Sequence, residues 1–259
     1  MSLAELTSEG QVAYLTLNRP DARNALSVEL CNDIFEALLK VNVEVARALV
    51  VRGAGPVFCS GADFAAVSGT GGLDFLPAFE RMLEGLARFR LPTIAAVRGA
   101  ALGGGLQLAT VCDFRVAADD ARLGIPSSRL GIVVNFENVR RLVLLVGMAR
   151  AKEVLMTART YSGDDAVAAG LVNEVAAAQS LDARVAEFAG EVASLAPLAV
   201  QGAKREVNLV ADHTGPTREE HSDLIEGVDA LVANAYNSED LAEGIRALTE
   251  KRKPRFTGH

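Results

Sequence analysis

The chain has 259 residues, of which 50% are hydrophobic and 23% are charged. A chain of this length and composition can bury a sizeable core, which excludes an intrinsically disordered protein. The formal net charge of −7 argues against nucleic acid or an anionic membrane as a partner, because both attract broadly basic surfaces. Any anionic ligand therefore needs a local cluster of cations.

Three cysteines, Cys31, Cys59 and Cys112, form neither an even-numbered disulfide framework nor a pattern with metal-ligand spacing. We expect Cys59 and Cys112 to be small buried hydrophobic residues. The first ten residues lack a basic start and an apolar core, and the longest uncharged apolar run, 99–112, is too short to cross a bilayer. These features predict a cytoplasmic protein without membrane insertion.

The first half of the chain predicts alternating strands and helices. Apolar and polar residues alternate over 12–17, which predicts a strand that ends in a turn at 18–20. Ser27 is a candidate N-cap for a helix whose apolar residues recur at helical spacing up to Val41. Further buried strands are predicted within 46–55, 91–99 and 113–117, and further helices over 75–90 and 136–146. The fold class is therefore α/β.

The C-terminal part predicts helices only. A capping box at 162–165 precedes a short helix at 166–169, and strand signals end near residue 196. Helices are predicted over 197–210, 217–234 and 238–251, the last with Ser238 as its N-cap. We therefore divide the chain into an α/β core, 1–196, and a helical region, 197–259, that covers the core or forms a subunit contact.

The segment "GAALGGGLQLATVCDF", 99–114, places three glycines between an apolar strand and an apolar helix. Free N–H groups and the helix dipole favour an anion or oxyanion there, and the absence of side chains allows a close approach. The spacing excludes a dinucleotide-binding motif, because Leu108 occupies the position of its last glycine, and it excludes a P-loop. Taken alone, the glycines suit a tight packing turn equally well.

A second loop, "GAGPVFCSGADF" at 53–64, also follows a predicted strand and places small residues before a predicted helix start, with Asp63 near the cap. Two such loops can present two amides. A pair of backbone donors that converge on a thioester or ester carbonyl forms an oxyanion hole. The sequence leaves their convergence open.

Six segments occur in family order along nearly the whole chain: "NRPDARNALS", "GPVFCSGADF", "AAVRGAALGGGLQLATVCDFRVA", "GLVNEV", "PLAVQGAKREVN" and "EKRKPRF". Together they resemble the enoyl-CoA hydratase/isomerase (crotonase) family. The resemblance implies a spiral of ββα turns with a C-terminal three-helix region, assembled as a homotrimer or a dimer of trimers. It also implies an acyl-CoA ligand, with coenzyme A present only as part of that ligand, and no metal.

The resemblance assigns the two oxyanion amides to Ala62 and Gly104. It places the CoA moiety along one further set of residues: Arg23, Ala25, Asp63, Phe64 and Ala65. Lys251 and its basic neighbours would reach a phosphate on a neighbouring subunit, as a local clamp. Two simpler hypotheses stay open, in which Asp63 only starts a helix and the basic C-terminal stretch is a solvated tail.

The family pattern breaks at two positions. Family hydratases use two glutamates around one water, and this chain has Gln107 and Ser127 at those positions. Gln107 lies one helical turn after Gly104 and is expected to face the same pocket. An amide cannot titrate and a serine without a nearby histidine is a poor base, so ordinary hydration should be weak or absent. Both side chains could still hold a water or a polar acyl group.

In the next loop, Asn135 stands where some family isomerases carry an acid. Glu137 is the nearest candidate replacement, although a glutamate that opens a helix typically complements the helix dipole. The first hypothesis is therefore an acyl-CoA thioester-binding protein of fatty-acid or lipid metabolism. Family members without these glutamates occur, including mycobacterial ones with similar segments.

The alternative is an active enzyme, an enoyl-CoA isomerase, a thioesterase or a weak enoyl-CoA hydratase, that uses Glu137 or another group. A structural module without a ligand is disfavoured, because nothing would then favour two glycine-rich amide loops. The acyl chain length and the pathway stay undetermined at this stage.

Overall fold

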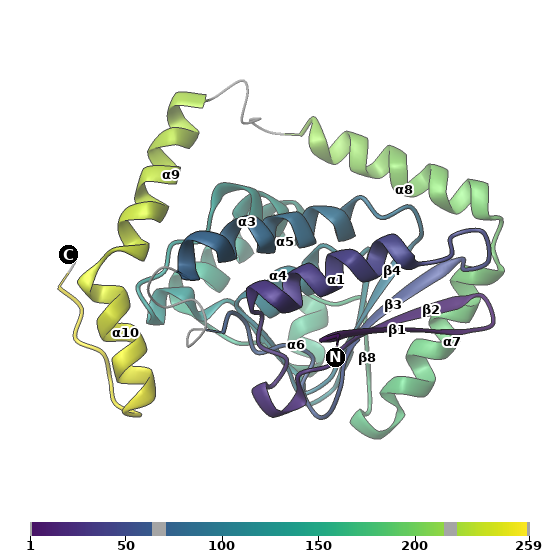
Figure 1. Ribbon diagram of the computed structural model, residues 1–259, viewed down its shortest axis with the longest axis horizontal. Coiled ribbons are helices and arrows are strands. Elements are labelled where there is room, and N and C mark those ends of the chain that lie inside the picture. The colour runs from purple at the N-terminus through teal and green to yellow at the C-terminus, as the bar shows by residue number, and fades with distance from the viewer. Residues whose placement is uncertain (1, 64–70, 215–221, 258–259) are drawn as a thin grey trace. The chain divides into compact units, whose positions relative to one another are not determined.

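The computed structural model describes residues 2–63, 71–214 and 222–257 (Figure 1). Within these residues the main sheet has the strand order β1-β2-β3-β4-β6-β8, and β5 pairs with β7 in a second, two-stranded sheet. In the main sheet β1 runs antiparallel to β2, and the remaining neighbours are parallel. The strands are β1 (Ala4–Glu9), β2 (Val12–Leu17), β3 (Ala48–Gly53), β4 (Thr93–Val97), β5 (Ala100–Leu102), β6 (Phe114–Ala118), β7 (Arg122–Gly124) and β8 (Glu174–Ala176).

The helices alternate with the strands and then follow them, as the predicted α/β class requires. They are α1 (Val28–Lys40), α3 (Gly71–Ala87), α4 (Gly104–Thr110), α5 (Phe136–Thr157), α6 (Gly163–Ala168), α7 (Leu181–Ser194), α8 (Pro197–Asp212), α9 (Ser222–Tyr236) and α10 (Glu239–Thr249). Short 3-10 turns occur at η1 (Pro20–Ala22), η2 (Pro126–Arg129) and η3 (Ala178–Ser180). In the described parts of the chain, every helix is too short or too polar to span a bilayer.

Contacts along the chain define two compact units. The first comprises residues 1–123 and 161–206, and the second comprises residues 124–160 and 207–259. The second unit therefore combines α5 with α9 and α10, and it takes residues from both sides of the predicted boundary at 196. The division into a core, 1–196, and a helical region, 197–259, stays a prediction.

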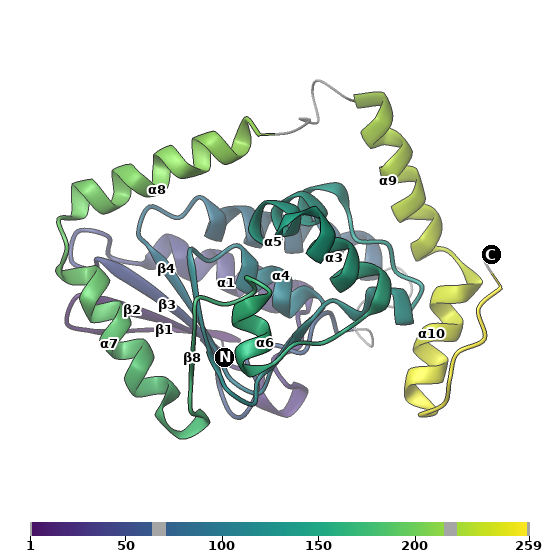
Figure 2. The ribbon, with the colours of Figure 1, turned by 180° about the vertical axis from the view of Figure 1, so that it is seen from behind.

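The first unit is built around buried parallel strands. All five residues of β4 are buried, as are the first four of β3. Helices α1 and α3 pack on each other on one side of the sheet, and α7 lies on the other side (Figures 1 and 2). Strands covered on both faces need apolar residues at successive positions, which explains the uninterrupted runs at 48–51 and 94–97.

The register of β3 and β4 positions the candidate site. Val51 lies opposite Ala95 and Arg52 lies opposite Ala96, in parallel orientation. The carboxyl ends of the two strands therefore meet at one edge of the sheet, which is where ligands of parallel sheets commonly bind. The loop that contains Ala62 and the loop that contains Gly104 both begin at this edge.

Two predicted helix caps are confirmed. The Leu30 N–H donates to Ser27 Oγ at 3.3 Å at the start of α1, and the Leu241 N–H donates to Ser238 Oγ at 3.0 Å at the start of α10. Each cap satisfies one of the N–H groups that a helix start leaves without an intrahelical partner. The predicted strand 12–17 matches β2, and the three helices predicted after residue 196 correspond to α8, α9 and α10.

Several expectations require correction. Ser162 precedes α6, but its side chain makes no capping hydrogen bond, so the predicted capping box does not form. The helix predicted over 136–146 is present, but a further helical stretch that follows Gly147, where φ is 74°, and runs to Thr157 was not predicted. The helix predicted over 75–90 covers 71–87 instead. The predicted start of α9, at residue 217, lies outside the described residues.

Candidate functional site

The two glycine-rich loops are joined by backbone hydrogen bonds. The Cys59 N–H donates to the Ala100 carbonyl at 3.0 Å, and the Leu102 N–H donates to the Cys59 carbonyl at 3.1 Å. Gly105 packs against the Cys59 carbonyl, because a Cβ atom on Gly105 would stand only 2.3 Å from the Cys59 carbonyl oxygen. A side chain at Gly105 is therefore incompatible with this approach of the loops.

The orientation of the Ala62 amide follows from its neighbours. The Gly61 carbonyl accepts from the Leu26 N–H at 2.8 Å, and the Asp63 N–H donates to the Leu26 carbonyl at 2.8 Å. In a trans peptide the C=O and the following N–H point in opposite directions. The Ala62 N–H therefore points away from Leu26.

The Gly104 amide is oriented by the same rule. The Gly103 carbonyl accepts from the N–H groups of Leu106 and Gln107, both at 3.1 Å, so it points along α4. The Gly104 N–H consequently points out of the start of the helix. Within residues 2–63 and 71–214, neither the Gly104 N–H nor the Ala62 N–H donates to a backbone carbonyl.

These two amides lie in one neighbourhood. A Cβ atom on Gly61, the residue before Ala62, would stand 3.6 Å from the Gly104 nitrogen. Gly61 also has a φ of 106°, in the region that favours glycine. The peptide units that carry these two unpaired backbone donors are therefore neighbours in space.

Apolar side chains border this pair of donors. A Cβ atom on Gly104 would stand 3.2 Å from Leu26 Cδ1 and 3.4 Å from the Phe79 ring. Phe79 comes from α3 and stacks on Phe75, with ring centroids 5.4 Å apart. Both phenylalanines are almost fully buried. They therefore belong to the apolar core that packs against the start of α4.

Gln107 is buried in α4, with 9% of its surface exposed. Its backbone N–H closes the first turn of the helix on the Gly103 carbonyl. None of the residues that the structure describes forms a hydrogen bond with its side-chain amide. The amide is nevertheless in contact with solvent. The amide therefore borders accessible space, on the side of α4 that includes Gly104.

Arg19 links the segment before α1 to the loop of Ala62. Its guanidinium lies 3.0 Å from the Asp63 carboxylate and donates to the Ala25 carbonyl at 2.6 Å. The side chains of the ion pair are only 21% and 18% exposed. Such an arrangement limits the movement of the residue next to Ala62. Arg19 was not predicted as a site residue, because its partner Asp63 is 44 residues away in the sequence.

Asn24 holds the same region together from inside. It is fully buried and has a φ of 53°, which asparagine tolerates better than most residues. Its side-chain oxygen accepts from the Arg19 N–H at 2.9 Å, and its side-chain nitrogen donates to the carbonyls of Ala54 and Val57. Asn24 was not predicted either. The only sequence signal for it was a polar residue directly before the apolar pair Ala25 and Leu26, ahead of the predicted helix.

The structure places the other predicted ligand-binding residues as follows. Arg23 is exposed with a φ of 52°, and its carbonyl accepts from the Ser60 N–H at 3.1 Å. Ala25 is buried beside it. Asp63 forms the ion pair with Arg19, and Phe64 and Ala65 lie outside the described residues. The structure thus joins the segment of Arg23 directly to the loop of Ala62.

Ser127, Glu137 and Lys251 belong to the second unit. Ser127 lies in η2, where its carbonyl accepts from Leu130 at 2.9 Å. Glu137 lies in the first turn of α5, after an Asn135 side chain that caps the helix. This is the position at which a carboxylate complements the helix dipole. Lys251 is exposed just after α10.

The three cysteines are buried, as expected for Cys59 and Cys112. Burial raises the pKa of each thiol to about 12. The thiols therefore stay protonated at neutral pH and are poor nucleophiles. In the described parts of the chain no cluster of three or more His, Cys, Asp or Glu side chains is placed to hold a metal ion.

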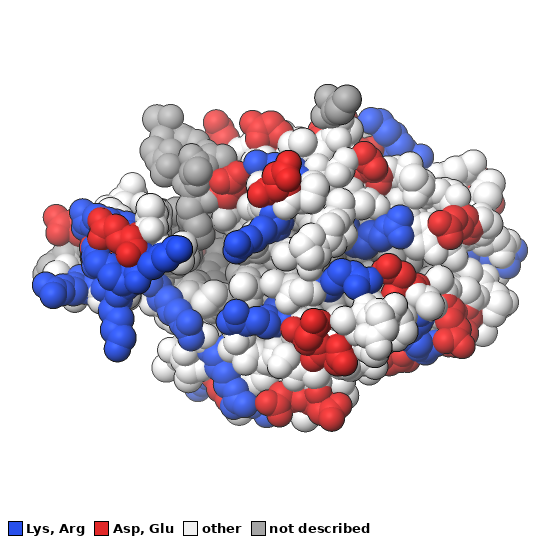
Figure 3. Space-filling view, turned by 90° about the horizontal axis from the view of Figure 1, so that it is seen from below, with Lys and Arg blue, Asp and Glu red and all other residues white. Residues whose placement is uncertain are grey.

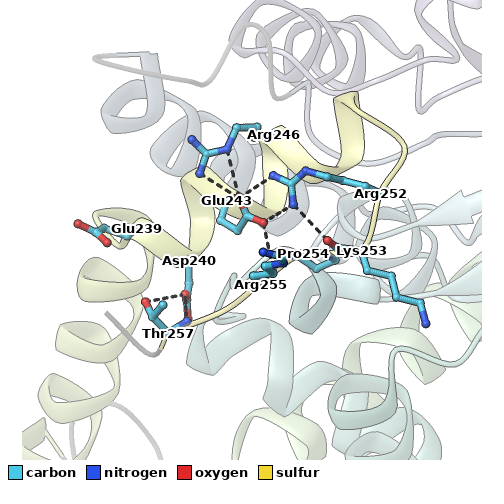
Figure 4. A pocket seen from close by; sticks show the side chains of 9 residues that line it. All are labelled: Glu239, Asp240, Glu243, Arg246, Arg252, Lys253, Pro254, Arg255 and Thr257. Atoms are coloured by element: carbon cyan, nitrogen blue, oxygen red, sulfur yellow. Dashed lines mark hydrogen bonds and ion pairs between the residues drawn. The ribbon is translucent and has the colours of Figure 1, made fainter.

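Charged groups gather at the C-terminal end of the second unit. Figure 3 shows Lys and Arg side chains concentrated over α10 and the segment that follows it. Two arginines converge on Glu243, with Arg252 at 2.5 and 2.8 Å and Arg246 at 2.9 Å (Figure 4). These hydrogen bonds lower the pKa of Glu243. The Lys253 side chain points away from this cluster.

Comparisons with known proteins cover the whole chain. A family model described as enoyl-CoA hydratase/isomerase matches residues 7–259. The chain is 35% identical to the enoyl-CoA isomerase/hydratase fer4 of Mycosarcoma maydis, over 99% of this chain and 95% of that protein. It is 36% identical to the probable enoyl-CoA hydratase echA6 of Mycobacterium leprae, over 98% of each.

Solved structures agree with this assignment. The structure of methylmalonyl-CoA decarboxylase complexed with 2S-carboxypropyl-CoA has a TM-score of 0.90 and 27% identity, over 100% of this chain and 99% of that one. An enoyl-CoA hydratase/carnitine racemase of Magnetospirillum magneticum has a TM-score of 0.79 and 31% identity, over 100% and 97%. The α/β fold, the segment order and these matches establish that the chain belongs to the enoyl-CoA hydratase/isomerase family.

Proposed function

We propose that this protein binds acyl-CoA thioesters and that the N–H groups of Ala62 and Gly104 donate to the thioester oxygen. The supporting observation is the orientation of the two peptide units, 61–62 and 103–104, which leaves two adjoining donors unpaired among the described residues. Related structures of methylmalonyl-CoA decarboxylase are described as complexes with 2-nitronate-propionyl-CoA and with 2S-carboxypropyl-CoA, which favours a CoA derivative as the ligand class.

In this proposal the protein lacks the two acid–base side chains that would add water to a double bond efficiently. Addition of water to a double bond needs one group that takes a proton from water and one that delivers a proton to carbon. Gln107 is a buried amide and Ser127 is a hydroxyl, and neither exchanges protons readily near neutral pH. General acid–base catalysis contributes about 10² to 10⁴ in rate per group, so hydratase activity should be weak or absent.

The remaining parts of the CoA moiety have further proposed contacts. Its nucleotide end would lie along the segment of Arg23 and Ala25 and along residues 62–65. Lys251 would contact a phosphate of CoA bound to a neighbouring subunit, in a homotrimer or a dimer of trimers. The exposure of Arg23 and Lys251 is compatible with these roles.

Isothermal calorimetry with butyryl-CoA and free CoA tests the oxyanion proposal. Ala62→Pro removes the N–H at that position, whereas Ala62→Gly keeps it. We expect the wild type and Ala62→Gly to prefer the thioester, and Ala62→Pro to bind butyryl-CoA about tenfold more weakly. Circular dichroism verifies that both variants fold. Equal affinity of the folded proline and glycine variants for butyryl-CoA would contradict the proposal.

The names of several relatives support a second candidate function, turnover of enoyl-CoA, with Glu137 in the first turn of α5 as the candidate carboxylate. A steady-state assay with crotonyl-CoA and longer enoyl-CoA thioesters separates the two functions. Binding without catalysis predicts little turnover and no change in the Glu137→Gln variant. Turnover typical of a hydratase that is lost in Glu137→Gln would establish the second function instead.

A further inference from the structure

A cavity of about 260 Å³ lies in the first unit where β2, β3 and β4 end. Thr16 in β2, Arg52 in β3 and Ala96 in β4 are register partners, so they lie in one row on the same face of the sheet. The first two residues of α7 complete the cavity on that face. Helix α3, which places Phe79 beside Gly104, packs on the other face together with α1 (Figures 1 and 2). The cavity is therefore separate from the proposed thioester site.

Arg52 brings a cation to this cavity without a carboxylate beside it. Its Nε–H donates to Thr16 Oγ1 at 3.1 Å, and its guanidinium lies 4.8 Å from the centroid of the Tyr14 ring. Among the described residues, no acceptor binds the two terminal nitrogens of Arg52. The hydrogen bond and the ring contact thus hold the guanidinium in place and leave its two terminal NH₂ groups for a ligand.

Two uncharged donors border the same cavity. The Thr16 hydroxyl oxygen accepts from Arg52, so its own proton is available to an acceptor. The Gly55 N–H donates to no acceptor in the described parts of the chain. The Ala54 carbonyl before it accepts from Asn24 Nδ2 at 3.0 Å, so the Gly55 N–H points away from the buried Asn24. The cavity therefore collects donors that a bound oxygen could accept from.

The charges that line the cavity indicate the class of ligand. Arg98, directly after β4, lies 3.0 Å from the Asp182 carboxylate, so these two charges compensate each other. Two arginines and one carboxylate leave a single excess positive charge, that of Arg52. A dianion would be repelled by the Asp182 carboxylate. A carboxylate matches the single excess charge, and its two oxygens can accept from both terminal nitrogens of one guanidinium.

We propose that this cavity binds a small organic monocarboxylate, which accepts from the Arg52 guanidinium, the Thr16 hydroxyl and the Gly55 N–H. The volume leaves room for a short carbon chain beside the carboxylate, and Ala96 and Leu181 give that chain apolar contacts. This site goes beyond the proposed function, because it lies on the opposite face of the sheet from Gly104 and binds its ligand without the thioester.

Saturation-transfer NMR with butyrate, butyramide and methyl phosphate tests the proposal at constant ionic strength. Butyramide has the shape of butyrate without its charge, and methyl phosphate is mostly a dianion at neutral pH. We expect butyrate to bind at least about tenfold more tightly than butyramide, because hydrogen bonds to a charged acceptor are the stronger ones. Butyrate should also bind more tightly than methyl phosphate. A saturating amount of butyryl-CoA should leave butyrate bound.

Variants of the lining residues locate the binding. Arg52→Met removes the guanidinium and should abolish the preference for butyrate over butyramide. Arg52→Lys keeps the charge without the planar pair of donors, so it should retain only part of that preference. Asp182→Asn removes the repelling charge and should improve binding of methyl phosphate more than that of butyrate. Thermal unfolding verifies that every variant is folded.

Arg81→Met is the matched control. Arg81 also lies over an aromatic ring, that of Phe35, and donates to one side chain, that of Asn32, but it is not part of the cavity. Its replacement should leave butyrate binding at the wild-type level. A loss of butyrate binding in Arg81→Met equal to that in Arg52→Met would contradict the assignment of the site to Arg52.

The remaining outcomes separate this site from the proposed function. Equal affinities for butyrate and butyramide, or unchanged butyrate binding by folded Arg52→Met, would overturn the site. If Arg52→Met does not fold, unchanged affinities in both Arg52→Lys and Asp182→Asn would overturn it. Tighter binding of methyl phosphate than of butyrate would overturn the carboxylate class. Displacement of butyrate by butyryl-CoA would assign the butyrate to the thioester site, whereas failure of butyryl-CoA to bind would overturn the proposed function alone.

Discussion

The loops of Ala62 and Gly104 and the C-terminal segment 239–257 both present hydrogen-bond donors, but the donors differ in kind. In the loops they are backbone N–H groups whose directions follow from the Gly61 and Gly103 carbonyls. In the C-terminal segment they are guanidinium groups that converge on Glu243. Backbone donors depend on close packing, whereas ion pairs depend on charge, pH and salt. Substitutions in the loops should therefore destabilise the protein through steric overlap, whereas those in the C-terminal segment should have effects that depend on pH and salt.

The largest expected effect is steric and falls on the loops. Gly105→Ala would place a Cβ atom 2.3 Å from the Cys59 carbonyl oxygen, which is backbone and cannot move aside cheaply. We expect this single methyl group to lower the free energy of unfolding by about 3–5 kcal/mol, as severe overpacking does. Urea unfolding monitored by circular dichroism measures the change.

Gly202→Ala is the matched control. Gly202 lies in α8, and a Cβ atom there would meet nothing within 4 Å. The same substitution should raise the free energy of unfolding by about 0.5–1 kcal/mol, because alanine favours helix. Similar losses in both variants would contradict the conclusion that the loops rely on close backbone contact.

An intermediate effect is expected at Arg19, which combines both kinds of interaction. Arg19→Met removes the ion pair with Asp63 and the hydrogen bond to the Ala25 carbonyl, both largely shielded from solvent. We expect a loss of about 1–3 kcal/mol in unfolding free energy, because hydrogen bonds to charged groups are among the stronger ones. Binding of acyl-CoA should weaken as well, since Asp63 follows Ala62 directly.

Arg88→Met provides the comparison for Arg19. Arg88, directly after α3, pairs with Glu84 in the last turn of that helix, and both side chains are well exposed. Exposed pairs of this type contribute about 0.3–0.5 kcal/mol. Equal losses of unfolding free energy in Arg19→Met and Arg88→Met would show that the Arg19–Asp63 ion pair stabilises the loop no more than an exposed pair does.

The smallest effect is expected at Glu243, where the contribution is ionic and pH-dependent. Hydrogen bonds from Arg252 and Arg246 and from the Arg255 N–H lower the pKa of this carboxylate below its ordinary value of 4.5. A lowered folded-state pKa means that the contribution is complete at neutral pH and is lost as the pH falls below that ordinary value. Glu243→Gln lacks this dependence.

Hydrogen exchange of α10 amides in the wild type and in Glu243→Gln provides the measurement. The difference in protection should be modest at neutral pH and should shrink with acid and with added salt. A difference that is insensitive to both would indicate that Glu243 acts through packing. The C-terminal segment would then resemble the loops more closely than its charges suggest.

Local signals explain which parts of the fold were predictable. Helix α1 begins after a serine cap and has apolar residues at helical spacing, and β3 and β4 are continuous apolar runs. Strand β1, "AELTSE", was missed because its main support is pairing with β2 and not its own pattern. Helix α7 was also missed, although Leu181, Val185 and Ala189 recur at intervals of four residues.

The candidate site was predictable in its glycines and unpredictable in its supports. Both loops were predicted from their glycines, but the direction of each amide depends on hydrogen bonds to Leu26 and along α4 that only the folded chain provides. Arg19 and Asp63 are distant in sequence, and Asn24 is a single buried amide with partners 30 and 33 residues later. Contacts over such separations leave no local pattern.

The trans geometry of the peptide units 61–62 and 103–104 has a consequence for how this scaffold can diverge. A backbone donor persists through nearly any exchange of the side chain attached to it, proline apart. If the two amides bind the thioester oxygen as proposed, new chemistry can arise at neighbouring side chains while both donors persist. Relatives with different reactions can therefore share one architecture without rebuilding it.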